Sequence, residues 1–428
     1  DPISQTEYYQ LLAFFNSTSE SPMDGNKYDY GPVMKVPADQ KAWDEWEGLT
    51  SERKGLLEEV ASQHASLLTG AEKERWEKAP ARDNLNRVAD PKGPFKDSPL
   101  HQKASTLAKR FNESEKRFTS TLVARELDKP RPTKMLLRGE YDRPVGESVH
   151  PDIPSAMGTL PKGAQRNRLG LAQWLISRDN PLVSRVLVNR IWQRIFGEAI
   201  VRSPEDFGLQ GKHPTHPELL DWLAVELQEN DWDLQHLLRL ILTSRTFKQQ
   251  SAHRKGAFED SENLWYARGP SYRLDAEVIR DMALWSSKLL DGHMGGEGVK
   301  PYQPAGLWKA LMHPASNTKN YVADKGSKLY RRSLYVYWKR TSPHPMMILF
   351  DAPDRESSCV RRSRTNTSLQ SLGLLNETQR IEMSRKLAER LITEARDNDS
   401  RLDLLFTLVA SRPPRDAERK ACTALLKR

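Results

Sequence analysis

Apolar residues recur at helical spacing along most of the chain. Residues 3–16 have the pattern of one amphipathic helix, and residues 39–78 and about 100–127 form two longer, highly charged stretches with narrow apolar stripes. Narrow stripes on long helices are typical of two helices that pack against each other. We therefore predict an N-terminal helical hairpin.

The segment from Lys129 to Pro161 breaks this pattern. It is rich in Pro and Gly and contains one short strand-like run, from Met135 to Tyr141. Such a composition predicts a β-hairpin or an extended connector. We place the domain boundaries here, with a first part at residues 1–128, a connector at 129–165 and a helical domain at 166–428.

Helices with recognisable ends follow the connector. Asn180-Pro181 places a cap residue before a proline at the first helical position, and Gly197 ends that helix. Thr215 and Glu218 have the spacing of a capping box and predict the start of the next helix. The predicted fold class is mainly α: a multi-helix domain preceded by a helical hairpin and a short β-hairpin connector.

Net charge and sequence motifs indicate which classes of binding partner to expect. The 428 residues carry a formal net charge of +9, which indicates a slightly basic surface or attraction to an acidic partner. No zinc-finger or RRM pattern and no unbroken basic helix occurs, so nucleic acid is not an expected partner. No apolar run has the length of a transmembrane segment.

The cysteines and the first residue bear on cofactors and processing. Cys359 and Cys422 are the only cysteines, and neither a CxxC nor a CxxCH haem-attachment motif is present. The chain begins at Asp1 without a signal peptide, which predicts a piece of a longer or processed protein.

The most informative segment runs from Tyr330 to Glu377, where charged residues follow directly on aromatic and aliphatic ones. Charges beside so much apolar surface must be paired, because an unpaired buried charge is strongly destabilising. One interpretation is an anion site, in which arginines hold a sulfate, carboxylate or phosphate. The residues that would bind the anion are Arg355, Arg361, Arg364 and Asn366.

The same segment allows two other interpretations. As catalytic groups, the candidates are Asp351, Asp354, Glu356 and Cys359, with the carboxyl groups as acid or base and the thiol as nucleophile or redox centre. As structural groups, the three carboxylates pair with the arginines, and the thiol is buried and inert. Ion-pair networks and buried cysteines are common, which favours the structural interpretation.

Two further patterns are weaker. His213 and His216, with Glu218 behind them, resemble a metal motif, but prolines hold this segment extended and a structural helix entry explains it better, so no metal is predicted. Three aromatic residues could stack on a sugar, although core packing is their ordinary role; they are Tyr335, Tyr337 and Trp338. No GxSxG, Walker A, GxGxxG or kinase signature is present.

Three long runs carry a resemblance to a known family. They are NPLVSRVLVNRIWQRIFGEAIVRSPEDFGLQGKHPTHPELLDWLAVEL (residues 180–227), RRSLYVYWKRTSPHP (331–345) and FDAPDRESSCVRRSRTNTSLQSLGLLNE (350–377). These runs resemble the planctomycete-specific domain (PSD) family of uncharacterised proteins. Residues 1–16 resemble the end of a cytochrome-associated companion domain that precedes it, most of which would be missing here.

The resemblance implies an extracytoplasmic protein, periplasmic or secreted, without an established activity. It implies no cofactor in this chain, a c-type haem in a missing N-terminal module, and a cytochrome or a sulfatase-like protein as partner. We predict a binding or assembly module of such a cytochrome-associated protein, with an anion site in the cluster from Asp351 to Asn366. The alternative is a hydrolase or lyase that acts on sulfated or other anionic polysaccharide.

Overall fold

The computed structural model describes residues 3–19, 33–64, 66, 68, 70–252, 260–311 and 319–426. The chain forms two compact units. The N-terminal unit consists of Ser4–Ile153 with Arg166–Arg168, and the C-terminal unit consists of Pro154–Gln165 and Leu169–Arg428 with Asp1–Ile3. Most regular structure in the described residues is helical, so the predicted mainly α fold is confirmed.

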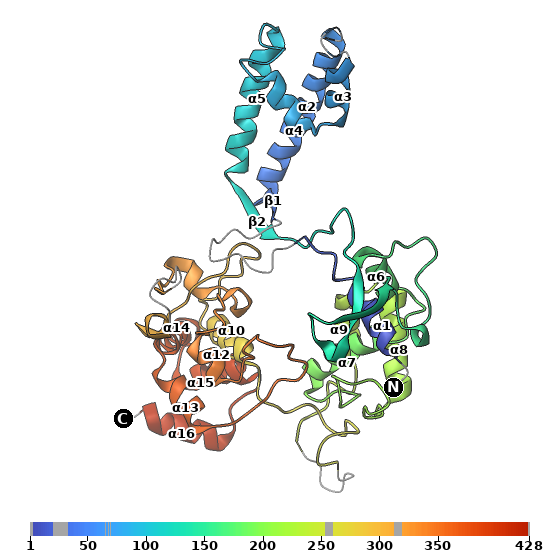
Figure 1. The fold of residues 1–428 in the computed structure, drawn as a ribbon. Helices are drawn as coiled ribbons and strands as arrows, with labels where there is room; N and C mark the ends of the chain where they lie inside the picture. The colour runs from blue at the N-terminus through green and yellow to red at the C-terminus, as the bar shows by residue number, and fades with distance from the viewer. Residues whose placement is uncertain are drawn as a thin grey trace. The chain divides into compact units, whose positions relative to one another are not determined.

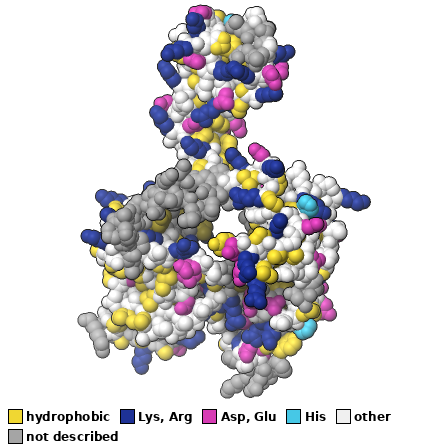
Figure 2. Space-filling model, in the orientation of Figure 1, with side chains coloured by type: hydrophobic (Ala, Val, Ile, Leu, Met, Phe, Trp, Pro, Cys, Tyr) yellow, Lys and Arg dark blue, Asp and Glu magenta, His cyan; other side chains and the backbone are white. Residues whose placement is uncertain are grey.

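The N-terminal unit contains the predicted helical hairpin. Its long helices α2 and α5 lie side by side (Figure 1) and enclose a core that includes Val60, Val88 and Phe95. Basic and acidic side chains are interspersed over its outer surface (Figure 2). The elements of this unit are α1 (Gln5–Ala13), β1 (Val33–Pro37), α2 (Gln40–Gln63), α3 (Gly70–Lys78), α4 (Ala81–Val88), α5 (Pro99–Glu115), β2 (Phe118–Leu122), β3 (Thr133–Leu136), η1 (Leu137–Gly139) and β4 (Pro144–Val149).

Two predicted boundaries in this unit are wrong. The stretch predicted as one helix over 39–78 is divided into α2 and α3, and the helix predicted to reach about residue 127 ends at Glu115. Beyond that point, β2 pairs in antiparallel register with β1, from Phe118 opposite Pro37 to Leu122 opposite Val33. The partner strand lies about 80 residues away in sequence, so a local pattern could not reveal this pairing.

The predicted β-hairpin connector is present, with a shorter first strand. Strand β3 ends at Leu136, where the sequence suggested a run to Tyr141, and pairs antiparallel with β4. Arg138 and Gly139 take positive φ angles of 54° and 78°, which turn the chain out of the strand.

The C-terminal unit has two apolar cores. The first, around Val188, Trp192 and Leu227, joins α7, α8 and α9, and the second, around Met347 and Phe350, joins α10 and α12. The elements are η2 (Ser155–Met157), α6 (Arg168–Leu175), α7 (Val183–Phe196), α8 (Pro217–Glu229), α9 (Leu234–Thr243), α10 (Ala276–Ser286), α11 (Leu307–Leu311), η3 (Gly326–Tyr330), η4 (Ser333–Tyr335), α12 (Pro345–Leu349), α13 (Ser368–Asn376), α14 (Thr378–Glu394), α15 (Asn398–Ala410) and α16 (Asp416–Leu426). None of the described helices combines the length and apolarity that a membrane span requires.

The predicted helix ends are partly confirmed. Gly197 ends α7 as predicted, but the predicted start is wrong, because α7 begins at Val183 with Leu182 at its N-cap. The Asn180 side-chain oxygen accepts hydrogen bonds from the N–H groups of Leu182 and Val183, both at 3.0 Å, in the turn that leads into the helix. The predicted capping box at Thr215 is wrong. His216 occupies the N-cap of α8 without a side-chain bond, and the Thr215 hydroxyl donates instead to the Ile200 carbonyl at 3.4 Å.

A buried arginine holds the second half of the C-terminal unit together. Arg280 on α10 is 5% exposed, and its guanidinium donates to the carbonyls of Leu329 (2.8 Å) and Arg331 (2.9 Å) and to the Gln379 side chain on α14 (2.9 Å). The nearest Asp281 oxygen is 3.8 Å away. Burial lowers the pKa of Arg280 to about 10, which keeps it charged at neutral pH.

His344 lies beside this arginine and is 3% exposed. Its Nε2 lies 3.0 Å from the Tyr302 carbonyl, to which it donates, while Nδ1 has no hydrogen-bond partner among the described residues. Burial, and then the charge of Arg280, lower the pKa of His344 to about 4.

We expect Arg280→Met to lower the free energy of unfolding by about 3 kcal/mol, because it leaves several buried carbonyls without a donor. The matched control is Arg385→Met on α14, where a 72% exposed side chain makes a surface pair with Glu389. The control should lose less than about 0.5 kcal/mol. Urea denaturation measures the free energy of unfolding of both variants. An equal decrease in the two variants would contradict the role of Arg280.

His344 predicts acid sensitivity of the C-terminal unit. Its pKa is lower in the folded than in the unfolded chain, so the unfolded state binds the proton first as pH falls. The contribution of the neutral His344 ring to the free energy of unfolding is fully present above about pH 6.5. As pH falls from there to about pH 4, the free energy of unfolding decreases by roughly 3 kcal/mol. The free energy of unfolding, measured at several pH values across this range, should fall less steeply for His344→Gln than for the wild type. Identical slopes for the two proteins would contradict this role of His344.

Candidate functional site

The segment 351–366 connects α12 to α13 and is fixed at both ends by Asp351. This carboxylate accepts hydrogen bonds from the Thr365 N–H at 2.8 Å and the Thr365 hydroxyl at 3.0 Å, and it pairs with Arg273. Arg273 also donates to the Thr365 carbonyl at 2.9 Å and lies over the Phe350 ring. Asp351 therefore closes the segment into a loop, a structural role for a residue that the sequence offered as a catalytic candidate.

The next candidates form a turn on the surface. The Asp354 carboxylate accepts from the Glu356 N–H at 3.0 Å, and the Arg355 guanidinium lies 4.4 Å from the centre of the Trp338 ring. The Trp338 indole N–H donates to the Asp354 carbonyl at 3.0 Å. Arg355 thus stacks on the ring that was considered for sugar stacking, and it lies outside the two arginine-lined cavities described below.

Arg362 is the best-paired arginine of the segment. Its two terminal nitrogens donate to both carboxylate oxygens of Glu277 at 2.6 and 3.2 Å, and one lies 3.5 Å from Asp275. Burial would raise the pKa of Glu277, but the bonds from Arg362 outweigh it and lower that pKa. The predicted pairing of these arginines with Asp351, Asp354 and Glu356 is wrong here, because the carboxylates come from the start of α10.

Arg364 is much less completely paired. Its guanidinium lies 4.3 Å from the centre of the Tyr272 ring and donates to the Gly197 carbonyl at 3.3 Å. The buried Nε has no hydrogen-bond partner among the described residues, and Asp275 is 3.9 Å away. The side chain is 23% exposed, so it combines a fixed position with unused donors.

Gly197 at the end of α7 makes this arrangement possible. Its φ is +86°, and a Cβ at this position would lie 2.6 Å from the Tyr272 ring. The Tyr272 hydroxyl donates to the Arg194 carbonyl at 2.6 Å, one of the carbonyls that the last helical turn leaves without a partner. The ring under Arg364 is therefore held by the helix end itself.

These residues surround a cavity of about 600 Å³, which we call the arginine cavity. Four arginines and two glutamates line it, together with smaller residues from α7 and the segment. The lining residues are Gln193, Arg194, Gly197, Glu198, Glu205, Ser358, Val360, Arg361, Arg362, Ser363 and Arg364. The Arg361 side chain is 56% exposed, with its nearest carboxylate, that of Glu198, at 3.8 Å.

Asn366 does not join this site. It is exposed and does not line the arginine cavity. The start of α13 is closed by a capping box, in which the Thr367 hydroxyl accepts from the Gln370 N–H at 3.3 Å. A capped helix start has fewer N–H groups to offer, so the predicted contribution of residues 365–367 to an anion site is not supported.

Cys359 lies on the surface, so the prediction of a buried cysteine is wrong. Its thiol is 3.4 Å from the Arg361 carbonyl, to which it donates. It lines a second cavity of about 430 Å³, to which Val360 also contributes. The sequence could not distinguish the two environments, because the loop is closed by Arg273, 86 residues away.

Of the two histidines of the HxxH pattern, His216 packs against aromatic residues and His213 is exposed. The His216 ring packs against Trp265 and Tyr266, with centroids 5.7 and 5.3 Å apart, and burial lowers its pKa. In the part of the chain that the structure describes, no group of three or more His, Cys, Asp or Glu residues could hold a metal ion.

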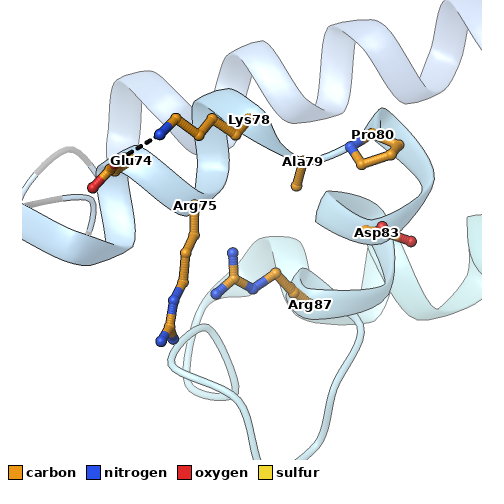
Figure 3. Close-up of a pocket in the computed structure, with 7 residues that line it drawn as sticks. All are labelled: Glu74, Arg75, Lys78, Ala79, Pro80, Asp83 and Arg87. Carbon is orange, nitrogen blue, oxygen red and sulfur yellow. Dashed lines mark hydrogen bonds and ion pairs between the residues drawn. The ribbon is translucent and has the colours of Figure 1, made fainter. Parts of the chain in front are cut away.

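A further cavity of about 610 Å³ lies in the N-terminal unit, between α3 and α4 (Figure 3). Arg75 and Arg87 reach toward the same space, but both have interaction partners, and Lys78 pairs with Glu74 at 2.5 Å. Asp83 adds another acidic group. Mixed, exposed charges make this a weaker anion site than the arginine cavity.

The chain matches a known protein-family model. Residues 167–426, which include the arginine cavity and every candidate residue of the segment 351–366, match the PSD1 family model, described as "Protein of unknown function (DUF1553)". The match covers more than half of the chain. The chain belongs to the PSD1 family. Neither a curated protein nor a solved structure matches it.

The pairing in the PSD1 domain predicts unequal effects of neighbouring arginines. We expect Arg362→Ala to lower the free energy of unfolding by about 2 kcal/mol, because the partly buried Glu277 loses its bidentate partner. Arg361→Ala, on an exposed side chain, should change it by less than about 0.5 kcal/mol. Chemical denaturation of both variants tests this, and a larger loss for Arg361→Ala would refute the assignment.

Proposed function

We propose that the PSD1 domain of this chain is a non-catalytic binding module that takes an anionic group into the arginine cavity. The observation that carries this proposal is the incomplete pairing of Arg364 within a cavity lined by four arginines. A sulfate, phosphate or carboxylate has several acceptor oxygens, and guanidinium donors bind such groups in directed pairs. An anion in the cavity would supply the acceptors that Arg364 lacks.

The four arginines divide into two pairs with different roles. Arg194 and Arg362 bind Asp275 and Glu277 at 2.6 Å, so their charges are already neutralised. Arg361 and Arg364 have their nearest carboxylates at 3.8 and 3.9 Å, beyond hydrogen-bond distance. The first pair fixes the walls of the cavity, and the second pair supplies donors to a ligand.

The geometry favours binding over the hydrolase or lyase alternative. Acid catalysis at neutral pH needs a carboxyl group whose pKa is raised, so that it holds a proton. Beside these arginines, the pKa of Glu277 is lowered, and Asp351 is occupied by Thr365 and Arg273. These two carboxylates, which lie outside the lining of the cavity, are therefore suited to hold arginines in place.

The wider setting stays a prediction from the family resemblance. It comprises an extracytoplasmic location, a c-type haem in another module, and a cytochrome or sulfatase-like partner. An anionic polysaccharide is the ligand source that this setting suggests, and it is the first probe for the cavity.

We expect a sulfated polysaccharide to raise the melting temperature of the chain more than a simple salt of matched ionic strength. At 100 times the Kd the stabilisation is about 2.7 kcal/mol, or roughly 5–10 °C. Arg364→Ala should abolish the difference, whereas Arg178→Ala, an exposed α6-adjacent arginine paired with Glu229, should keep it. Equal shifts in both variants would mean non-specific attraction to the basic surface.

A further inference from the structure

A second cavity adjoins the arginine cavity, and the two share four lining residues. The shared residues are Gln193, Arg194, Ser358 and Val360. This neighbouring cavity, of about 430 Å³, is bounded by α7, by α9 and by the segment around Cys359. A ligand held in one cavity would therefore border directly on the other.

The second cavity has a different chemical character. Its walls include Ile191 and Ile195 on α7, Leu238 on α9, and the shared Val360. Apolar walls favour an apolar group, because its burial removes hydrocarbon surface from water on both sides. Inorganic sulfate or phosphate would gain nothing from them.

Arg190 gives this cavity a charge of its own. The side chain is exposed, lines the cavity, and has no ion-pair or hydrogen-bond partner among the described residues. Leu238, which lines the cavity from α9, is 37% exposed, although its neighbours Leu237 and Ile241 are buried in the core. The cavity thus combines an apolar surface with positively charged arginines. Such a surface is complementary to a molecule that has an apolar body and a negative charge.

We infer that the ligand of this domain is an organic anion, whose charged group lies in the arginine cavity and whose apolar body lies against Ile191, Leu238 and Val360. This inference rests on the proposed anion site and adds the class of molecule that carries the anion. An aryl sulfate and an aryl phosphate share this chemistry, and both are suitable probes.

Cys359 provides a direct reporter of the second cavity. In the Cys422→Ser variant of the 428-residue chain it is the only thiol, and its alkylation by the uncharged reagent iodoacetamide can be followed over time. We expect 2-naphthyl sulfate at ten times its Kd to slow alkylation by about tenfold, since only the unliganded fraction reacts. Sodium sulfate at equal ionic strength should leave the rate unchanged.

Two variants separate the parts of the site. Leu238→Ser should weaken protection by naphthyl sulfate, whereas Leu242→Ser, 40% exposed on the same helix and outside the cavity lining, should not. Arg364→Ala should abolish protection. Replacing naphthyl sulfate by naphthyl phosphate tests whether the cavity binds both anionic groups or sulfate only.

The outcomes also distinguish this inference from the proposed function. If naphthyl sulfate and inorganic sulfate protect Cys359 equally, or if an Arg364-dependent ligand binds without protecting it, the inference fails and the anion site stands. If no anion shifts the melting temperature or protects the thiol, both fail. Protection by naphthyl sulfate alone, lost in Leu238→Ser and Arg364→Ala, supports both.

Discussion

The second half of the C-terminal unit depends on the burial of the Arg280 guanidinium group. The Arg280 guanidinium has N–H donors on all three of its nitrogens. In the core these donate to main-chain carbonyls and to the side-chain oxygen of Gln379. Each partner must lie at a fixed place, because an unsatisfied buried charge is strongly destabilising. The charge therefore orders the loops around η3 and η4, and α14, against α10. The same helix, α10, carries at its start Asp275 and Glu277, which pair with arginines that line the cavity.

Fixed carboxylates at that helix start explain how neighbouring arginines acquire different roles. Asp275 and Glu277 hold Arg194 and Arg362, so part of the positive charge is used in joining α7, α10 and the segment before α13. Arg364 lies over an aromatic ring and donates to one carbonyl. Stacking on Tyr272 positions this arginine without neutralising it, which leaves its charge available to a ligand.

The ends of secondary-structure elements carry the site. The last turn of α7 leaves carbonyls without helical partners, and that of Arg194 accepts from Tyr272. The carbonyl of Gly197, just beyond the helix, accepts from Arg364. Gly197 turns the chain there and leaves room for the tyrosine ring. A rigid helix thus supplies one wall of both cavities, and a loop closed by Asp351 supplies the other, so the two chemical environments are joined at Val360.

The sequence alone determined the mainly α fold, the helical hairpin and the stop at Gly197, since these follow from local periodicity and backbone geometry. It also drew attention to the segment that contains Arg361 and Arg364. Tertiary structure decided the partners: Arg273 for Asp351, Glu277 for Arg362 and Tyr272 for Arg364 lie 78 to 92 residues apart in sequence. Strand pairing and ion pairing between distant residues depend on how the whole chain packs, and no local pattern encodes them.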